Sequence, residues 1–323
     1  MIELSEIRKA AARISGRVHR TPILSSQTLG DRVGVKLFLK CECFQKTGSF
    51  KPRGALNKVL SLSDDERNRG LITVSAGNHA QAVAWAARQV GVPCAVVMPT
   101  DAPGSKVDAV HGYGGEVIFH DDRATLFDKL NEEREKRGST FVHPFDDPAV
   151  LAGAGTAGLE IIEDCPDVDV VIVPVGGGGL MGGVTSAVKG LKPGVKVFAV
   201  ELEAGPGLKP ALDAGKPVHV DRPYGTIADG MTPPFVGQLP MEIARDAVDE
   251  IVTVTEEEII TAMKALMTRA KLYVEGSGAA ATAALLHRKI DPPSGAKVVC
   301  LVSGGNVDLK KISTVFAPPT RPL

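Results

Sequence analysis

Apolar and polar side chains alternate along this chain with two different spacings. Near the start, apolar residues recur at helical spacing until Gly16 interrupts them, which predicts an N-terminal helix. Residues 35–41 alternate apolar and polar side chains, which predicts a strand. Ser63 and Glu66 have the spacing of a capping box, so a helix is expected to begin there and to end at Gly70.

From residue 71 onward, short apolar runs alternate with polar or glycine-rich loops and with helical patterns. In the first half, the apolar runs lie at 71–74, 95–98, 116–119 and 140–142, and the helical patterns at 80–90, 105–110 and 123–137. In the second half, apolar runs recur at 170–175, 195–200, 251–254 and 298–302. Fully apolar strands that alternate with helices predict parallel sheets covered by helices on both faces. Two such sets predict two α/β domains.

The composition is that of a soluble globular enzyme. Hydrophobic residues make up 44% and charged residues 23%, so neither a disordered chain nor a membrane protein is expected. A formal net charge of −1 offers no basic surface, so neither nucleic acid nor a membrane is expected as a partner. The first residues show no signal-peptide pattern, which favours a cytoplasmic protein. The length of 323 residues suffices for about two domains.

The cysteines predict no disulfide framework. They lie at positions 41, 43, 94, 165 and 300, without the paired spacing of a zinc site. Cys41 and Cys43 are expected on one face of a strand, as small buried side chains.

One lysine is distinguished by its neighbours. Lys51 follows Ser49 and Phe50 and precedes Pro52, which suits the first turn of a helix. A lysine at a helix start is unusual, because the helix dipole disfavours a positive charge there and favours a neutral amine. A neutral amine can form a Schiff base with an aldehyde cofactor. The alternative is a solvated surface lysine.

Three further loops follow predicted strands, where ligands bind in parallel sheets. They comprise residues 75–79, 176–179 and 303–306.

The second of these loops contains four consecutive glycines before a helical pattern. Backbone N–H groups can converge there on an anion, most simply a phosphate. The alternative is a tight turn that only packs closely. The stretch also fits G-x-G-x-x-G at Gly177, Gly179 and Gly182, with Glu201 at the end of the next strand. An NAD-dependent oxidoreductase is therefore an alternative of a different class.

The loop at 75–79 reads Ser-Ala-Gly-Asn-His at a predicted helix start. Its hydroxyl, amide, imidazole and backbone N–H groups suit a carboxylate, and Asn78 can also donate to a phenolate-like oxygen. Alternatively, Ser75 is a simple N-cap and His79 a hydrogen-bonded structural histidine.

Together these loops resemble the serine/threonine dehydratase family of pyridoxal-phosphate enzymes, of fold type II (tryptophan synthase β-like). The most specific segments are Ser49-Phe50-Lys51-Pro52-Arg53-Gly54-Ala55 and Ser75-Ala76-Gly77-Asn78-His79. The match runs along nearly the whole chain, and within the family the chain most resembles the short catabolic-type threonine dehydratases. It implies a larger domain from residues 1–60 and 147–323, a smaller mobile domain at 61–146, and a homodimer or homotetramer.

The resemblance also implies site residues. Lys51 would hold pyridoxal 5'-phosphate as a Schiff base and act as the catalytic residue. Contacts to the cofactor would come from Phe50, Asn78, Gly176, Gly177, Gly178, Gly179, Leu180 and Ser303. Contacts to the substrate would come from Ser75, Ala76, Asn78 and His79.

The activity implied is β-elimination from L-threonine or L-serine. The freed Lys51 would remove the α-proton, the β-hydroxyl group would leave, and the released enamine would break down to 2-oxobutanoate or pyruvate and ammonia. Ser303 would hydrogen-bond the pyridine nitrogen without forcing its protonation, which favours elimination over reprotonation.

Several positions depart from relatives. Serine racemases of the family carry a serine at the position of Ala76 and an asparagine at that of Phe145, so elimination is expected rather than efficient racemisation. Ala154 and Gly276 also depart from the commonest pattern, which leaves hydroxyaspartate and phenylserine open as substrates. Glu201 matches an acidic residue that relatives use beside a cation, but the second acidic position falls on Gly207. No divalent metal site is therefore predicted.

Overall fold

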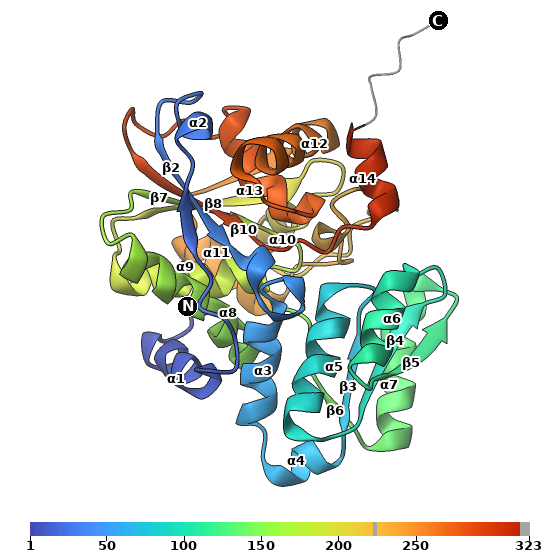
Figure 1. The fold of residues 1–323 in the computed structure, drawn as a ribbon. Helices are drawn as coiled ribbons and strands as arrows, with labels where there is room; N and C mark the ends of the chain where they lie inside the picture. The colour runs from blue at the N-terminus through green and yellow to red at the C-terminus, as the bar shows by residue number, and fades with distance from the viewer. Residues whose placement is uncertain (222–224, 317–323) are drawn as a thin grey trace, which may run out of the picture.

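The computed structural model describes residues 1–221 and 225–316. Its larger sheet has the strand order β1-β2-β10-β7-β8-β9 (Figure 1). Neighbouring strands are parallel, except that β1 runs antiparallel to β2. The strands are β1 (Ile23–Ser25), β2 (Lys36–Cys41), β7 (Val170–Pro174), β8 (Lys196–Leu202), β9 (Glu250–Val254) and β10 (Lys297–Val302).

Successive residues of this sheet point to opposite faces and meet different helices. On β10, Val298 and Cys300 belong to the core under α12 (Glu256–Ala265) and α13 (Gly276–Leu286). Val299 and Leu301 pack on the other face against further helices, α8 (Pro148–Asp164), α9 (Gly179–Leu191) and α11 (Gln238–Ala247). Both faces are therefore buried, which explains why these strands are apolar throughout.

The smaller sheet is entirely parallel, in the order β5-β4-β3-β6. Its strands are β3 (Leu71–Val74), β4 (Cys94–Pro99), β5 (Glu116–His120) and β6 (Thr140–Phe141). Val96 and Met98 face α5 (Asn78–Val90) and α6 (Gly104–Gly112), whereas Ala95 and Val97 face α7 (Leu126–Arg137). The predicted α/β class, with parallel sheets covered by helices, is confirmed.

Shorter elements complete the chain. The helices are α1 (Leu4–Ile14), α2 (Gln27–Gly30), α3 (Lys51–Ser61), α4 (Asp64–Asn68), α10 (Leu208–Ala214) and α14 (Leu309–Phe316). Single-turn segments are η1 (Glu42–Phe44), η2 (Lys46–Gly48), η3 (Arg123–Thr125), η4 (Asp229–Met231) and the π-helical η5 (Leu266–Ala270). The predicted capping box of Ser63 and Glu66 is present at α4. Within the described residues, no helix is long and apolar enough to cross a membrane.

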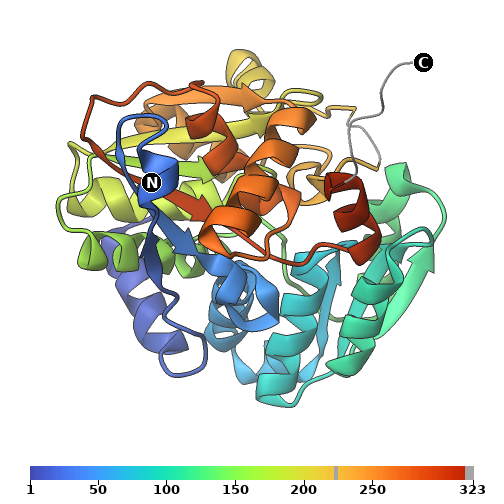
Figure 2. The ribbon, with the colours of Figure 1, turned by 45° about the horizontal axis from the view of Figure 1, so that its top comes forward.

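Helix α3 connects the two sheet units. It packs against α8 of the larger unit and against α5 of the smaller one. Figures 1 and 2 show α3 between the two units. The domain boundaries near residues 60 and 147 stay a prediction. All strands of the smaller sheet, β3 to β6, lie between these two positions, and the strands of the larger sheet lie before and after them.

One local expectation is wrong, and one strand was not expected. Strand β2 ends at Cys41 and Cys43 lies in η1, so the two cysteines do not share a strand face. Strand β1 was not predicted as a sheet strand, because it has only three residues at the edge of the sheet and lacks a buried alternation.

A buried ionic network holds the start of α3 against the larger unit. The guanidinium of Arg53 donates to both oxygens of Glu42 and to both oxygens of Glu160 on α8, at 2.7–2.9 Å. Lys40 of β2 also donates to Glu160. Arg53 and Glu42 are at most 1% exposed, so each charge depends on its partners. The network fixes the helix two residues after Lys51.

Replacing Arg53 with methionine leaves the buried Glu42 carboxylate unpaired. We expect Arg53→Met to lower the free energy of unfolding by about 3–5 kcal/mol, measured by urea denaturation. The control is Arg20→Ala, which removes exposed pairs with Glu163 and Asp164 and should cost less than about 1 kcal/mol. Equal losses in the two variants would contradict this account of the network.

Candidate active site

Lys51 is the first residue of α3, and its side chain is half-buried. Its Nζ donates to the Pro144 carbonyl oxygen at 2.8 Å and lies 5.1 Å from the centroid of the Phe50 ring. Burial lowers the pKa of Lys51 to about 8, and the nearby Glu275 carboxylate opposes this shift. Desolvation therefore raises the neutral fraction of the amine, in addition to the helix-dipole effect expected from the sequence. The half-buried, hydrogen-bonded side chain does not fit the alternative of a solvated surface lysine.

The lysine loop and the loop at 303–306 meet because their strands, β2 and β10, are neighbours. The N–H group of Phe50 donates to the carbonyl of Ser303 at 3.0 Å, and that of Gly305 donates to the carbonyl of Gly48 at 2.8 Å. Ser303 Oγ is buried and donates to the carbonyl of Ser277 at 3.2 Å. The parallel order thus brings Ser303 beside the backbone of the lysine loop.

The four-glycine loop follows β7, the other neighbour of β10. Pro144 and Phe145, which lie between β6 and α8, link this loop to Lys51. A Cβ atom on Gly177 would lie 2.2 Å from the Phe145 ring, and one on Gly179 would lie 3.0 Å from the Phe145 Cα. Gly178 has a φ of +91° and opposes Pro240. Close packing therefore requires glycine at these positions.

The same loop also presents free backbone donors. In the part of the chain that the structure describes, no acceptor takes the N–H groups of residues 176–180, which lie at the start of α9. These donors, together with the positive end of the helix, suit an anion. Close packing and free backbone donors thus occur in the same loop, and the anion cradle stays a prediction.

The loop at 75–79 joins β3 to α5, and its side chains have defined partners. Ser75 Oγ accepts from the N–H group of Gly77 at 3.1 Å. The Asn78 amide donates to Glu275 Oε1 at 2.7 Å, so it bridges the two sheet units. Among the described residues, the N–H groups of Ala76, Asn78 and His79 have no acceptor, and they remain available to a carboxylate.

The two histidines of the site are held neutral. His79 is buried, and its Nε2 lies 3.1 Å from the carbonyl of Val142, while burial lowers its pKa well below the usual range. His143 accepts N–H groups of Phe145 and Asp146 through Nδ1, and burial lowers its pKa to about 4. Each ring therefore has one nitrogen engaged by the backbone, Nε2 of His79 and Nδ1 of His143.

Glu201 and Gly182 do not form a dinucleotide site. The carboxylate of Glu201 accepts the N–H groups of Gly207 and Leu208 at 2.7 and 2.8 Å, so it caps the start of α10. Gly182 packs within α9 against Leu151 and Ile243. The residues that the structure describes contain no group of three or more His, Cys, Asp or Glu side chains that could hold a metal.

Sequence reasoning missed four residues that contact the predicted site. They are Lys106, Pro144, Glu275 and Asn306. Glu275 is buried, and burial raises its pKa to about 7. Its position directly before a Gly-Ser-Gly helix start was the available signal. Pro144 acts through its backbone carbonyl, which leaves no signal in the sequence.

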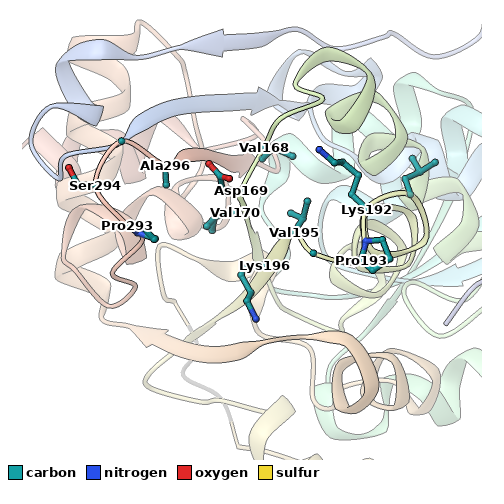
Figure 3. A pocket seen from close by; sticks show the side chains of 13 residues that line it. Val168, Asp169, Val170, Lys192, Pro193, Val195, Lys196, Pro293, Ser294 and Ala296 are labelled. Atoms are coloured by element: carbon teal, nitrogen blue, oxygen red, sulfur yellow. The ribbon is translucent and has the colours of Figure 1, made fainter.

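A wide depression of about 840 Å³ lies elsewhere, at the amino ends of β7, β8 and β10 (Figure 3). Asp169, Lys192, Lys196 and Ser294 are among its lining residues. It is at the opposite end of the strands from Lys51 and contains none of the predicted site residues.

Comparison with known proteins gives a consistent result. The family model described as pyridoxal-phosphate dependent enzyme matches residues 14–304. The L-threonine ammonia-lyase of Thermotoga maritima is 46% identical over 98% of this chain and 78% of its own. The catabolic L-threonine dehydratase TdcB of Escherichia coli K12 is 43% identical over 97% and 96% of the two chains. The structure of maize serine racemase superposes with a TM-score of 0.91 at 40% identity, covering 97% and 96%.

Gly177→Ala tests the packing of the glycine loop. Its Cβ would press on the Phe145 ring, so we expect a loss of about 1–3 kcal/mol in the free energy of unfolding, measured by urea denaturation. Gly194→Ala is the control, because a Cβ there meets nothing within 4 Å. If both variants were as stable as the parent protein, the loop would not be closely packed.

Proposed function

Because this chain belongs to the family of pyridoxal-phosphate dependent enzymes, we propose that it removes the β-hydroxyl and amino groups from L-threonine or L-serine. The products are 2-oxobutanoate or pyruvate, together with ammonia. The observation that carries this proposal is that the amine of Lys51 is held at the Pro144 carbonyl with a lowered pKa, which suits a base. His79 and His143 are hydrogen-bonded and neutral, and Ala76 has no proton to give.

The residues present fit the cofactor. Four buried polar side-chain atoms without partners belong to segments around Lys51, namely Thr47 Oγ1, Ser49 Oγ, His79 Nδ1 and Ser277 Oγ. The glycine loop adds unpaired N–H groups at a helix start. Unpaired buried polar groups are costly, so their concentration in one place indicates a site for a polar ligand.

We assign the cofactor contacts as follows. The N–H groups of residues 176–180 would hold the phosphate, and the Ser303 hydroxyl, which here donates to the Ser277 carbonyl, would turn to the ring nitrogen. Asn78 would donate to the 3-oxygen, and Phe50 would lie beside the ring. A neutral hydroxyl such as that of Ser303, unlike a carboxylate, does not stabilise a protonated ring nitrogen.

Bound pyridoxal phosphate supplies an electron sink for the α-carbon of an amino acid. The chain's own residues then supply binding and proton transfer. The neutral amine of Lys51 takes the α-proton. The N–H groups of Ala76, Asn78 and His79 and the hydroxyl of Ser75 bind the substrate carboxylate.

The side chains at positions 76 and 145 favour elimination over racemisation. A racemase must return a proton to the opposite face of the α-carbon, and Ala76 has no group that does so. Phe145 is buried under the glycine loop and likewise carries no exchangeable proton. Ala154, whose identity departs from relatives, is 1% exposed in the core beneath α9, so it gives no reason to prefer hydroxyaspartate or phenylserine.

The covalent role of Lys51 is tested by borohydride reduction of protein supplied with pyridoxal phosphate, followed by peptide mass spectrometry. We expect a phosphopyridoxyl group on Lys51, and ammonia release from threonine or serine that Lys51→Ala abolishes. The control is Lys58→Ala, which changes a lysine of the same helix that pairs with Asp147. An unmodified Lys51, or multiple turnovers by Lys51→Ala, would refute the proposal.

Cofactor capture should depend on pH in a defined direction. Only the neutral amine reacts, and the pKa of Lys51 is about 8, so the rate of capture by cofactor-free protein should rise as the pH rises through about 8. Absorbance after rapid mixing measures the rate. Nα-acetyl-lysine serves as the control, since its amine titrates near its ordinary value of about 10.4. A protein midpoint equal to that of the control would contradict the desolvation of Lys51.

A further inference from the structure

The carboxylate of Glu275 is buried and points away from the start of its own helix. Glu275 is the N-cap residue of α13, yet its side chain makes no hydrogen bond to the N–H groups of that helix. Instead Oε1 accepts from Asn78 Nδ2 at 2.7 Å, and the side chain is only 3% exposed. Gly304 makes the room, because a Cβ there would lie 2.3 Å from Oε1.

The other side of the Asn78 amide is also held. Its Oδ1 accepts from Asn306 Nδ2 at 2.8 Å and from Lys106 Nζ at 3.4 Å. Asn306 Nδ2 and Lys106 Nζ can only donate. If the Asn78 amide were rotated by half a turn, its Nδ2 would face these two donors and its Oδ1 would face Glu275, so all of these hydrogen bonds would be lost. The contacts therefore determine which end of the amide is nitrogen. One of the two N–H groups of Nδ2 is used by Glu275, and the other is left.

We propose that Glu275 is a positioning residue, which orients the Asn78 amide so that its remaining N–H group faces the 3-oxygen of the cofactor. This inference rests on the proposed function, because it needs the cofactor contact assigned there to Asn78. Asn78 belongs to the smaller sheet unit and Glu275 to the larger one. The hydrogen bond therefore forms only when the two units are together, and the donor to the cofactor is correctly aimed only in that arrangement.

In this proposal the hydrogen bond to Glu275, rather than its negative charge, orients the Asn78 amide. Two variants of Glu275 separate the effect of the hydrogen bond from that of the charge. Glu275→Leu removes the acceptor and puts an apolar side chain of similar size in its place. Glu275→Gln removes the charge and retains an acceptor oxygen. We expect Glu275→Leu to shift the visible absorption band of the resting, cofactor-bound protein and to raise the dissociation constant for pyridoxal phosphate roughly tenfold. Glu275→Gln should restore the band and bring the dissociation constant to within about twofold of the parent value.

A double variant tests whether Glu275 acts through Asn78. Asn78→Ala should shift the same band, and adding Glu275→Leu should then change nothing further, since the group to be oriented is gone. Asp229→Asn is the control for a general field effect, because Asp229 acts on Glu275 only through its charge and makes no contact with Asn78. If Glu275→Leu does not fold, Asn306→Ala replaces it, since it removes the donor on the other side of the amide and should shift the same band.

The results separate failure of this inference from failure of the proposed function. An unmoved band in Glu275→Leu or in its substitute, full additivity in the double variant, or an equal shift in Asp229→Asn would each overturn the positioning role. If the positioning role fails but borohydride reduction still leaves a phosphopyridoxyl group on Lys51 of the parent protein, the proposed function stands. If the parent protein binds no cofactor, both fail.

Discussion

A lysine amine removed from water is the constraint on which the site depends. Desolvation disfavours the ammonium form, and among the described residues the hydrogen-bond acceptor of the Lys51 amine is the carbonyl of Pro144. Such an amine is a nucleophile and a base near neutral pH, whereas a surface lysine stays charged. Holding it in place requires a rigid support. The buried network of Arg53, Glu42 and Glu160 supplies that support two residues along the same helix.

The glycine loop shows how packing and binding use the same residues. Phe145 and Pro240 lie so close that side chains at 177 and 178 are excluded, and the chain there takes a left-handed turn at Gly178. The same absence of side chains leaves the N–H groups of the loop open at the start of α9. Phe145 and the adjacent Pro144 thereby connect the donors proposed for the phosphate to Lys51, and one short segment after β6 contacts both.

Proton chemistry at the site is limited by what surrounds Lys51. Burial keeps His79 and His143 uncharged, so neither competes with Lys51 for a proton near neutral pH. The smaller sheet unit contributes the donors of residues 76–79, and the larger unit contributes Lys51, Ser303 and the glycine loop. The Asn78–Glu275 hydrogen bond and helix α3 join the two units at this point, so the site is complete only in their joint arrangement.

Much of this could be predicted from the sequence. Hydrophobic spacing located the strands of both sheets other than β1, because strands buried on both faces must be apolar throughout. The motifs around Lys51, Asn78 and the glycines indicated the family, because each needs particular residue types in a fixed order. Tertiary structure decided the rest. The order β2-β10-β7 made neighbours of loops more than a hundred residues apart, and only their contact reveals the carbonyl of Pro144, the direction of the Glu275 side chain and the commitment of the His79 ring to Val142. Backbone acceptors and side-chain directions have no signature in the amino-acid sequence, because any residue type supplies the same carbonyl and the direction of a side chain is set by the packing of distant segments.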